Sequence, residues 1–426
     1  MKLLNKLKFS NITYVLYQTF NMDLVFWIVI SNLFLTTAKG FSAFQIVLIT
    51  MLGIAFSLVL SPLTDWIAKK LNNKLLIVLG SVGFLITAIL FTFCSSLYVF
   101  IIAETIYYVA ASFRQVSYVM LENNLKQKGQ IDKFARWVNF GRLGYSTITL
   151  IIASVAGLLF NVSAYLPMYL SITFCVIGLA FSLLYTEPKQ EKQIVQQSAS
   201  QFKLKTLFKN KIFILILLMN ILFVGVYVFM QLNASLLIQL VCQEAEIDLA
   251  KISLIVSGIV LGSRICRVVS NTLFTEIDRR VKNKQHILRT ISICLVVSGI
   301  FFAVGANLFS NLIVKLVLIS IGFFMILAIR DIYSVLENKI IATNLTDEEQ
   351  KHALIFSNMC NHLGRLLSSV IALVVLKFTT LNIVYIGFAF VVIIQIFISF
   401  PLSKYLKPQN EKQIENSNQN SDINQV

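Results

Sequence analysis

The sequence predicts an all-α integral membrane protein whose twelve transmembrane helices form two six-helix, pseudo-symmetric lobes. Composition is the first observation: 57% of the 426 residues are hydrophobic, only 13% are charged, and the mean hydropathy is +0.79. A soluble domain cannot bury so much apolar surface. The second observation is that twelve apolar runs reach the length of about 20 residues that a membrane-spanning helix needs. The third is an internal repeat at half the chain length, which indicates two copies of one architecture.

The apolar runs and the polar stretches between them set the predicted boundaries. An N-terminal lobe at 1–186 contains spans at 12–36, 42–64, 73–96, 98–122, 138–160 and 164–186. A polar connector at 187–210 leads to a C-terminal lobe at 211–403, with spans at 211–240, 250–275, 287–308, 311–338, 354–378 and 381–403. The Asn/Gln-rich tail at 404–426 is predicted to be disordered because it has few apolar residues to bury.

The net charge of +16 indicates membrane orientation and not nucleic-acid binding. If the N-terminus is cytoplasmic, 28 of the 36 Lys and Arg residues fall in or beside the segments that twelve spans leave inside. Of the remaining eight, four lie at the outer ends and four within spans: Lys39, Lys251, Lys315 and Lys377, then Arg114, Arg264, Arg267 and Arg330. This positive-inside bias predicts a multi-pass protein of the cell membrane with both termini in the cytoplasm.

The internal repeat joins an arginine inside an apolar run, a glutamate near the end of that run, and a Gly-Arg-Leu that opens the next run. The two copies are Arg114, Glu122 and 141–143, and then Arg330, Glu337 and 364–366. The offset is 216 residues at the arginine, 215 at the glutamate and 223 at the Gly-Arg pair. The second copy therefore has the longer loop.

No catalytic or metal-binding constellation emerges from the sequence. The six cysteines are scattered without a C-x-x-C spacing, and the three histidines are not clustered. There is no G-x-x-x-x-G-K-[ST] phosphate loop, and no segment outside the spans is long enough for a nucleotide-binding domain. We therefore expect neither an enzyme nor a resident cofactor, and transport must be driven by a gradient or run downhill.

The loop between the second and third spans carries a recognisable motif. Residues 61–70 read SPLTDWIAKK, which resembles the major facilitator superfamily signature G-x-L-x-D-R-x-G-R-[RK]. The leucine, the aspartate and the two terminal basic positions match, whereas Ser61, Trp66 and Ala68 depart from it. A weaker echo, TEIDRRVKNK at 275–284, lies 210 residues after 65–74. The resemblance implies two lobes that alternate access to a central cavity.

By the same resemblance, Asp65 would close the cytoplasmic side. In the family this aspartate sits against the N-terminal end of helix 11, where backbone N–H groups favour negative charge. Lys69 and Lys70 would hold the loop inside, and they are topology anchors in any case.

Charged residues within spans are the main site candidates, since inserting one costs at least about 2.5 to 3.5 kcal/mol. In the family, helices 1, 4, 7 and 10 line the cavity. The resemblance therefore implies a substrate and proton cavity built from Asn21, Asp23, Glu104, Tyr107, Arg114, Tyr118, Tyr227, Gln231, Arg264, Arg330 and Asp331. On helix 7, Asn220, Tyr227 and Gln231 fall at i, i+7 and i+11, which predicts one helical face.

Asp23 and the arginines each admit more than one interpretation. Asp23 lies across helix 1 from the polar stripe of Gln18, Asn21 and Asn32, so it is either a proton or cation site or a structural, hydrogen-bonded position. Arg114 and Arg330, with Arg264 nearby, would bind an anionic substrate. Alternatively, Arg114 balances Asp23 or Glu104, or Arg330 pairs structurally with Asp331 or Glu337.

Glu122 and Glu337 lie about 10 to 12 Å closer to the cytoplasm than their arginines, at a rise of about 1.5 Å per residue. That depth suits a gate better than a substrate site. We predict symmetric ion pairs of Glu122 with Arg142 and of Glu337 with Arg365, which close the inner face and break when it opens.

Together these features predict a secondary transporter of a small molecule, working by alternating access as a monomer in the lipid bilayer. A carboxylate in helix 1 and an arginine in helix 4 resemble the drug:proton antiporter branch, which implies proton-coupled efflux. The alternative is uptake of a small organic anion bound by cavity arginines. A lipid-linked substrate and a non-transporting scaffold or sensor also remain open.

Overall fold

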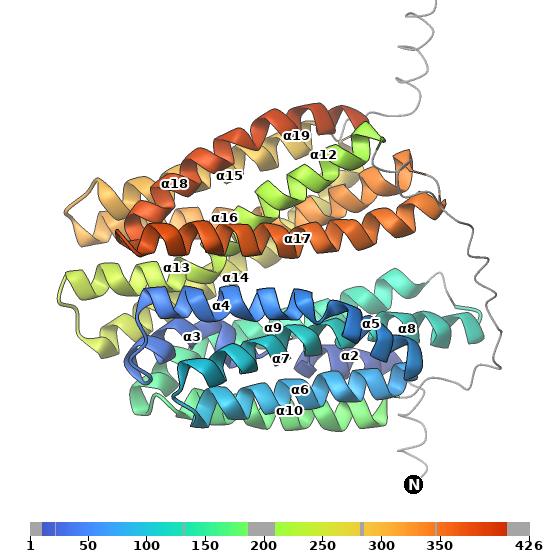
Figure 1. The fold of residues 1–426 in the computed structure, drawn as a ribbon, viewed down its shortest axis with the longest axis horizontal. Coiled ribbons are helices and arrows are strands. Elements are labelled where there is room, and N and C mark those ends of the chain that lie inside the picture. The colour runs from blue at the N-terminus through green and yellow to red at the C-terminus, as the bar shows by residue number, and fades with distance from the viewer. Residues whose placement is uncertain are drawn as a thin grey trace, which may run out of the picture. The chain divides into compact units, whose positions relative to one another are not determined.

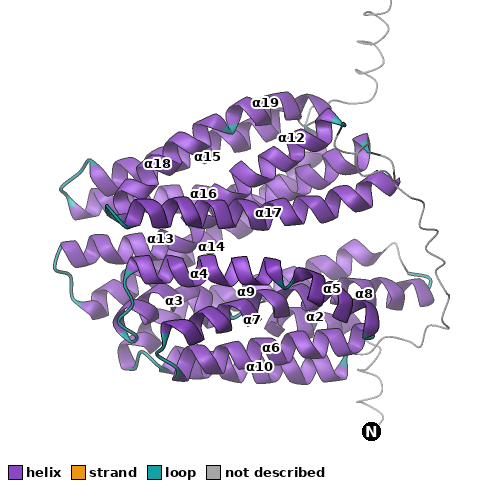
Figure 2. Cartoon of the chain, in the orientation of Figure 1, coloured by secondary structure: helices purple, strands orange, loops and turns teal. Residues whose placement is uncertain are grey.

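A computed structural model describes residues 11–21, 23–130, 133–185, 209–281, 285–345 and 347–406. Every regular element in these ranges is a helix, and they contain no strand (Figure 2). Eleven helical segments are long and apolar enough to cross a membrane, or twelve if the bent pair Ala43–Val59 and Ser61–Ala68 is one span. The predicted fold class, an all-α membrane protein of twelve spans, is confirmed.

The first six predicted spans correspond to nine helices (Figure 1). They are α2 (Asn11–Asn21), α3 (Val25–Thr37), α4 (Ala43–Val59), α5 (Ser61–Lys70), α6 (Asn73–Phe93), α7 (Leu97–Arg114), α8 (Val116–Gln127), α9 (Phe134–Val162) and α10 (Leu166–Leu184).

The last six predicted spans correspond to α12 (Lys211–Met219), the π-helical turn η2 (Asn220–Val224), α13 (Gly225–Glu244), α14 (Leu249–Arg280), α15 (Gln285–Asn307), α16 (Leu312–Asn344), α17 (Asp347–Leu376), α18 (Leu381–Ile394), α19 (Ile396–Ser403) and the 3-10 turn η3 (Lys404–Leu406).

The described chain divides into two compact units. The first unit combines the described residues of Met1–Gln197 with Ser235–Arg264 and Ala372–Lys377. The second unit combines those of Ser198–Ala234 with Ile265–Ile371 and Phe378–Val426. The predicted lobe limits at 186 and 211 stay a prediction. Below, "outer" and "inner" denote the helix ends that the sequence assigns to the outside and to the cytoplasm.

Several helices begin at a polar cap because the first N–H groups of a helix lack an intrahelical acceptor. Ser42 and Gln45 form a reciprocal capping box at the start of α4, two residues after Gly40, whose φ of 71° suits glycine. The Asn72 side chain accepts from Leu75 N at 2.8 Å and starts α6. Short polar loops thus define the ends of the apolar helices.

Lys39, in the loop after α3, contacts α3, the last turn of α6 and the loop before α10 at the outer end of the first unit. Its Nζ donates to the Thr92 carbonyl at 2.9 Å, and it lies 5.2 Å and 5.1 Å from the ring centroids of Phe34 and Tyr165. Burial lowers the pKa of this ammonium below its usual value.

Five of the predicted spans are irregular in the described chain. The fourth divides into α7 and α8, and the twelfth divides into α18 and α19. The second bends by 51° between α4 and α5, where Pro62 stands in the first turn of α5. The first is interrupted between Asn21 and Val25, so that Asp23 is not helical. The seventh contains η2, a wider turn than the α-helix.

The π-helical turn corrects one prediction. Asn220 begins η2, whereas Tyr227 and Gln231 lie beyond it on α13. A π-turn inserts one residue, which rotates the later residues by about 100° relative to a regular helix. Asn220 therefore does not share the face predicted for Tyr227 and Gln231, and it is fully buried.

Candidate functional site

Asp23 lies in the interruption of the first span, where its backbone is free of the helical ladder. Its Oδ1 accepts a hydrogen bond from the Leu24 N–H at 2.9 Å and another from the Tyr107 hydroxyl. Tyr107 comes from α7 and is held by stacking on Phe84, with ring centroids 5.5 Å apart. Asp23 is half-buried, and no cation among the described residues pairs with it.

Glu104 is a second acid of the first unit, located less than one turn before Tyr107 on α7. Its side chain is 9% exposed and packs against Gly53 of α4, where a Cβ would stand 2.5 Å from the Glu104 Cγ. Tyr108 lies within hydrogen-bonding reach, and the carboxylate of Asp23 is close enough to interact electrostatically. In this part of the described chain, two acids share an apolar region with hydroxyl partners.

Arg114 does not balance either acid in this structure. Its Nη1 donates to the Asn21 carbonyl at 3.5 Å, and the guanidinium lies 5.9 Å from the centroid of the Phe84 ring. The Asn21 side chain is 1% exposed and donates to the Ser81 hydroxyl at 2.5 Å, so it packs against α6. Tyr118 packs edge-on against Tyr14, with centroids 6.3 Å apart. The polar side chains on this face of helix 1 therefore contact neighbouring helices.

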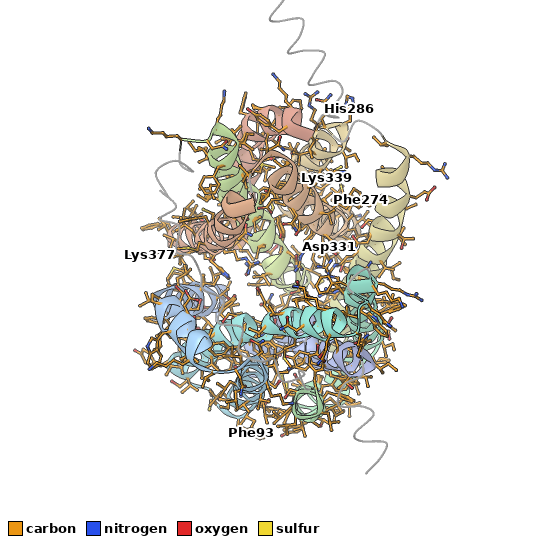
Figure 3. The ribbon with its side chains drawn as sticks, turned by 90° about the vertical axis from the view of Figure 1, so that its right-hand side faces the viewer. Phe93, Phe274, His286, Asp331, Lys339 and Lys377 are labelled. Carbon is orange, nitrogen blue, oxygen red and sulfur yellow. The ribbon has the colours of Figure 1, made fainter. Side chains whose placement is uncertain are left out.

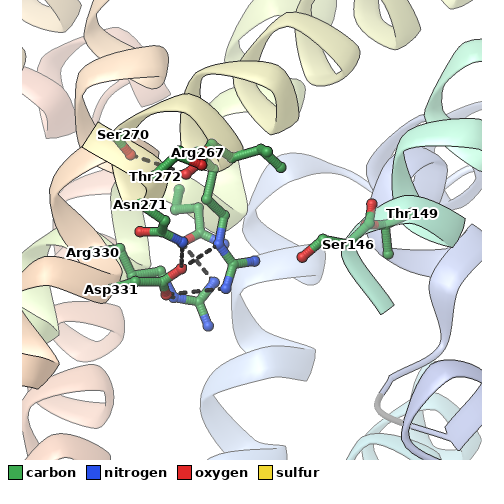
Figure 4. Close-up of polar contacts among 10 residues, drawn as sticks. Ser146, Thr149, Arg267, Ser270, Asn271, Thr272, Arg330 and Asp331 are labelled. Atoms are coloured by element: carbon green, nitrogen blue, oxygen red, sulfur yellow. Dashed lines mark hydrogen bonds and ion pairs between the residues drawn. The ribbon is translucent and has the colours of Figure 1, made fainter. Parts of the chain in front are cut away.

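In the second unit, a cluster of charged and polar side chains lies around Asp331 (Figure 4). Arg267 of α14 binds it with both ends of the guanidinium, Nε to Oδ2 at 2.7 Å and Nη2 to Oδ1 at 3.0 Å. Asn271, one helical turn beyond Arg267, donates to Oδ2 at 2.7 Å. Figure 3 shows Asp331 on α16, with Phe274 on α14. This bidentate geometry is the strong form of an arginine–carboxylate pair.

Arg330 extends the cluster to α13. Its Nη1 donates to the Gln231 Oε1 at 3.3 Å, and its Nε lies 4.0 Å from the Asp331 Oδ1. Tyr227, one turn before Gln231, packs against Phe223 with centroids 5.6 Å apart. The Arg330 side chain is 34% exposed. The predicted site residues Tyr227, Gln231, Arg330 and Asp331 are thus neighbours. Arg264 is 7% exposed and belongs to the first unit.

Arg267 and Asn271 were not predicted as site residues from the sequence. Arg267 stood out only as a charge within a span, and α14 was not among the helices that the resemblance assigned to the cavity. The available signal was the spacing: Arg267 and Asn271 lie four residues apart, which places both side chains on one helix face.

The predicted inner ion pairs are not formed in this structure. Glu122 pairs with Lys126 at 2.5 Å on its own helix, and Arg142 is exposed. A neighbour four residues along a helix is always within reach, which favours this local pair. Glu337 accepts hydrogen bonds from Asn220 at 2.6 Å and from Ser357, while the buried Nε of Arg365 has no hydrogen-bond partner among the described side chains.

The signature loop corresponds to α5. Asp65 is exposed and has no ion-pair partner among the described side chains. Lys70 stands over the ring of Trp66, with Nζ 3.9 Å from the centroid. Trp66 replaces the arginine of the family signature and here binds the basic residue by a cation–π contact. The side chain of Lys69 lies outside the described residues, and the latch role of Asp65 stays a prediction.

Neutral side chains connect helices at the outer ends of the first unit. Asn32 Nδ2 donates to the Ser235 hydroxyl at 2.9 Å, and Gln239 donates to Thr36 Oγ1 one turn further on. A second set of contacts joins α9 to α14. Asn161 donates to the Ala250 carbonyl at 3.1 Å, the Ser253 hydroxyl donates to Asn161, and Gly157 packs against Ser253 and Ser257.

An apolar groove of about 520 Å³ runs between α2 and α9. It is lined by Ile12, Val15, Thr19, Trp137, Phe140, Leu143, Gly144, Thr147, Ile148 and Ile151. The groove contains no charged residue and none of the candidate site residues. It is therefore not the polar site that the intramembrane charges indicate.

Comparison with known proteins agrees with this architecture. The family profile described as Major Facilitator Superfamily matches residues 15–368. The structure is similar to the nucleoside transporter NupG, with 15% identity, 93% of this chain and 99% of that chain covered, and a TM-score of 0.71. It also resembles a bacterial homologue of the human lysosomal transporter Spinster in an inward-facing and unoccupied conformation, with 12% identity, coverages of 93% and 96%, and a TM-score of 0.63.

No curated protein matches the chain significantly. Identities of 15% and 12% establish a shared fold and carry no substrate across. The family match extends over most of the chain, from the first described helix to α17. The chain therefore belongs to the major facilitator superfamily, and it is a secondary transporter that works by alternating access, not an enzyme.

Proposed function

We propose that this transporter couples the movement of a small molecule to protons, with Asp23 as the proton site. The observation that carries the proposal is the setting of Asp23: a half-buried carboxyl in a helix interruption, hydrogen-bonded by Tyr107 and paired with no described cation. An acid in this setting can gain or lose its proton without breaking an ion pair.

The second acid of this region strengthens the argument. Glu104 is buried close to Asp23, and two carboxylates in one apolar region repel each other unless at least one is protonated. Tyr107 can donate to an ionised Asp23 and can accept from a protonated one, because a phenol has both capacities. Glu104 and Tyr107 therefore support a site that exists in two protonation states.

Direction and orientation belong to the proposal as well. We infer export, with both termini in the cytoplasm and the monomer as the working unit. The positive-inside bias of the loops supports the orientation. The support for export is the resemblance to drug:proton antiporters, which also have a carboxylate in the first span and an arginine in the fourth, here Asp23 and Arg114.

A second candidate is transport of a small organic anion. The observation that favours it is the cluster of Arg267, Arg330 and Asp331, in which about a third of the Arg330 side chain is exposed. An anionic group would find a bidentate donor in Arg330. Nucleosides form a third class for testing, because NupG is a nucleoside transporter of the same fold.

The test is flux in proteoliposomes, with and without a pH gradient. The panel contains cationic and neutral drug-like compounds, nucleosides and organic anions, and the proteins are wild type, Asp23→Asn, Arg330→Ala and Glu276→Gln. Glu276 is the control because its carboxylate forms an exposed pair with Arg280 four residues away.

Asp23→Asn should abolish accumulation driven by the pH gradient and keep downhill flux, whereas Glu276→Gln should behave as wild type. Gradient-driven flux that survives in Asp23→Asn would refute the proton site. Flux restricted to anions and lost in Arg330→Ala would establish the second candidate.

A further inference from the structure

The second unit contains a buried acid that the proposed function does not use. Glu337 of α16 is 7% exposed and lies toward the inner end of its span. Its Oε1 accepts one hydrogen bond from Asn220 Nδ2 at 2.6 Å and another from the hydroxyl of Ser357. The three residues belong to η2, α16 and α17, so one carboxyl oxygen connects three helices.

The hydrogen bonds around Glu337 all run in one direction. The Tyr333 hydroxyl donates to Asn220 Oδ1 at 2.7 Å, and Asn220 Nδ2 also donates to the Ser357 hydroxyl at 2.8 Å. Every donor is neutral, and each bond leads toward Oε1. Within the described part of the chain, no hydrogen bond reaches Oε2.

The titratable groups that face Glu337 are Tyr333 on α16 itself and Cys360 on α17, a phenol and a thiol, and neither can supply a positive charge. Arg365, the predicted partner, lies two turns beyond Ser357 on α17 and forms no ion pair with Glu337 among the described side chains. The helices α12 and η2 contribute no charged group at this level.

An ionised carboxylate in such a site is unfavourable. Burial of an unpaired ion costs several kcal/mol, on the order of what a buried acid avoids by taking up a proton. A proton on Oε2 removes the charge and leaves Oε1 free to accept both bonds.

We propose that Glu337 is a second proton-binding site, which holds a proton on Oε2 in this conformation and releases it when Asn220 and Ser357 separate. On release the Oε2–H bond breaks, the proton passes to water and the carboxylate keeps one negative charge. The site is independent of Asp23, which lies in the first unit.

The surrounding backbone links this proton to helix packing. Asn220 is the first residue of the π-helical turn, and Gly225, the first residue after it, contacts Gly364 of α17. A Cβ on Gly225 would stand 2.5 Å from the Gly364 carbonyl oxygen. Any movement of α17 against η2 therefore changes the Ser357–Glu337–Asn220 contacts, and water that enters the gap stabilises the ionised acid.

Infrared spectroscopy tests the proposal without a substrate. The full chain in lipid nanodiscs is titrated with pH, and the carbonyl stretch of protonated carboxyl groups is compared between wild type and Glu337→Gln. At neutral pH, Glu337→Gln should lose the band of one carboxylic acid. Glu276→Gln, which removes an exposed acid, should lose only a carboxylate band.

A carboxylate band lost in Glu337→Gln at neutral pH would overturn the proposal. Ser357→Ala provides a second measurement that keeps the acid: removal of one hydrogen bond to Oε1 should shift the acid band to higher frequency, and an unshifted band would contradict the assignment. Asp23→Asn should leave the Glu337 band intact. The Glu337 proposal can therefore fail while the Asp23 proton site holds, and the reverse.

Discussion

Asp331 and Glu337 lie six residues apart on α16 and bind opposite kinds of partner. Asp331 receives a guanidinium through two bonds and an amide through a third. Glu337 receives only neutral donors. A carboxylate held by an arginine keeps its charge, whereas one held by neutral donors can exchange a proton. Whether an acid forms a structural ion pair or can exchange a proton therefore depends more on its hydrogen-bond partners than on its depth in the membrane.

Removal of Arg267 should destabilise the second unit. Arg267→Met preserves much of the side-chain volume but leaves the Asp331 carboxylate, whose side chain is 27% exposed, without its bidentate partner. We expect a loss of about 2 to 3 kcal/mol, somewhat less than the cost of breaking a fully buried pair. Thermal unfolding in detergent, followed by circular dichroism of the helices, measures the change.

Arg280→Met is the matched control. Arg280 pairs with Glu276 on the same helix, but the side chains are 77% and 45% exposed, and we expect a change within about 0.5 kcal/mol. The double variant Arg267→Met, Asp331→Leu should recover stability because it removes both charges. Equal melting temperatures for Arg267→Met and Arg280→Met would show that the bidentate pair is not structural.

At the scale of elements, the contact between the seventh and eleventh spans is made by backbone. Gly225 and Gly364 let η2, α13 and α17 approach so closely that a Cβ on Gly364 would stand 2.5 Å from the Ile221 carbonyl oxygen. Only residues without a side chain permit this distance. The π-helical turn therefore sits where two helices touch and where Asn220 turns toward Glu337.

Gly364→Ala should be harmful despite the higher helix propensity of alanine. The added methyl group must displace backbone, and overpacking of this kind costs about 1 to 3 kcal/mol. Gly387→Ala in α18 is the control, since its Cβ would meet nothing within 4 Å; it should be neutral or stabilising by up to about 1 kcal/mol. Melting temperatures of the two variants in the same detergent decide the matter, and equal values would exclude a tight contact at Gly364.

Hydropathy predicted the helical elements well because each span needs a long apolar run, and the spans at 73–96 and 287–308 correspond closely to α6 and α15. It could not predict the interruption at Asp23 or the π-helical turn at Asn220. Both leave the apolar run intact and change only which carbonyl each N–H binds. The predicted face of Asn220, Tyr227 and Gln231 was wrong for this reason.

At the scale of the molecule, the pseudo-symmetry of the sequence does not extend to its side-chain contacts. Glu122 and Glu337 occupy matching positions in the repeat, yet one forms an exposed pair with Lys126 and the other a buried contact with Ser357. Repetition in sequence predicts matching helices, but partners come from other helices whose residues differ. The cluster of Arg267 with Asp331 was missed for the same reason.

Lys39 offers a chemical way to establish which side of the membrane is which. Only an uncharged amine attacks an acylating reagent, and the lowered pKa of Lys39 means that more of it is uncharged at a given pH below the usual lysine range. A sulfonated succinimidyl ester, which does not cross bilayers, should acylate Lys39 in intact cells. Lys126, whose side chain is 59% exposed, should react only after the membrane is permeabilised. Peptide mass mapping that found the reverse order would place the termini outside the cell, so one partly buried amine serves as a marker of orientation.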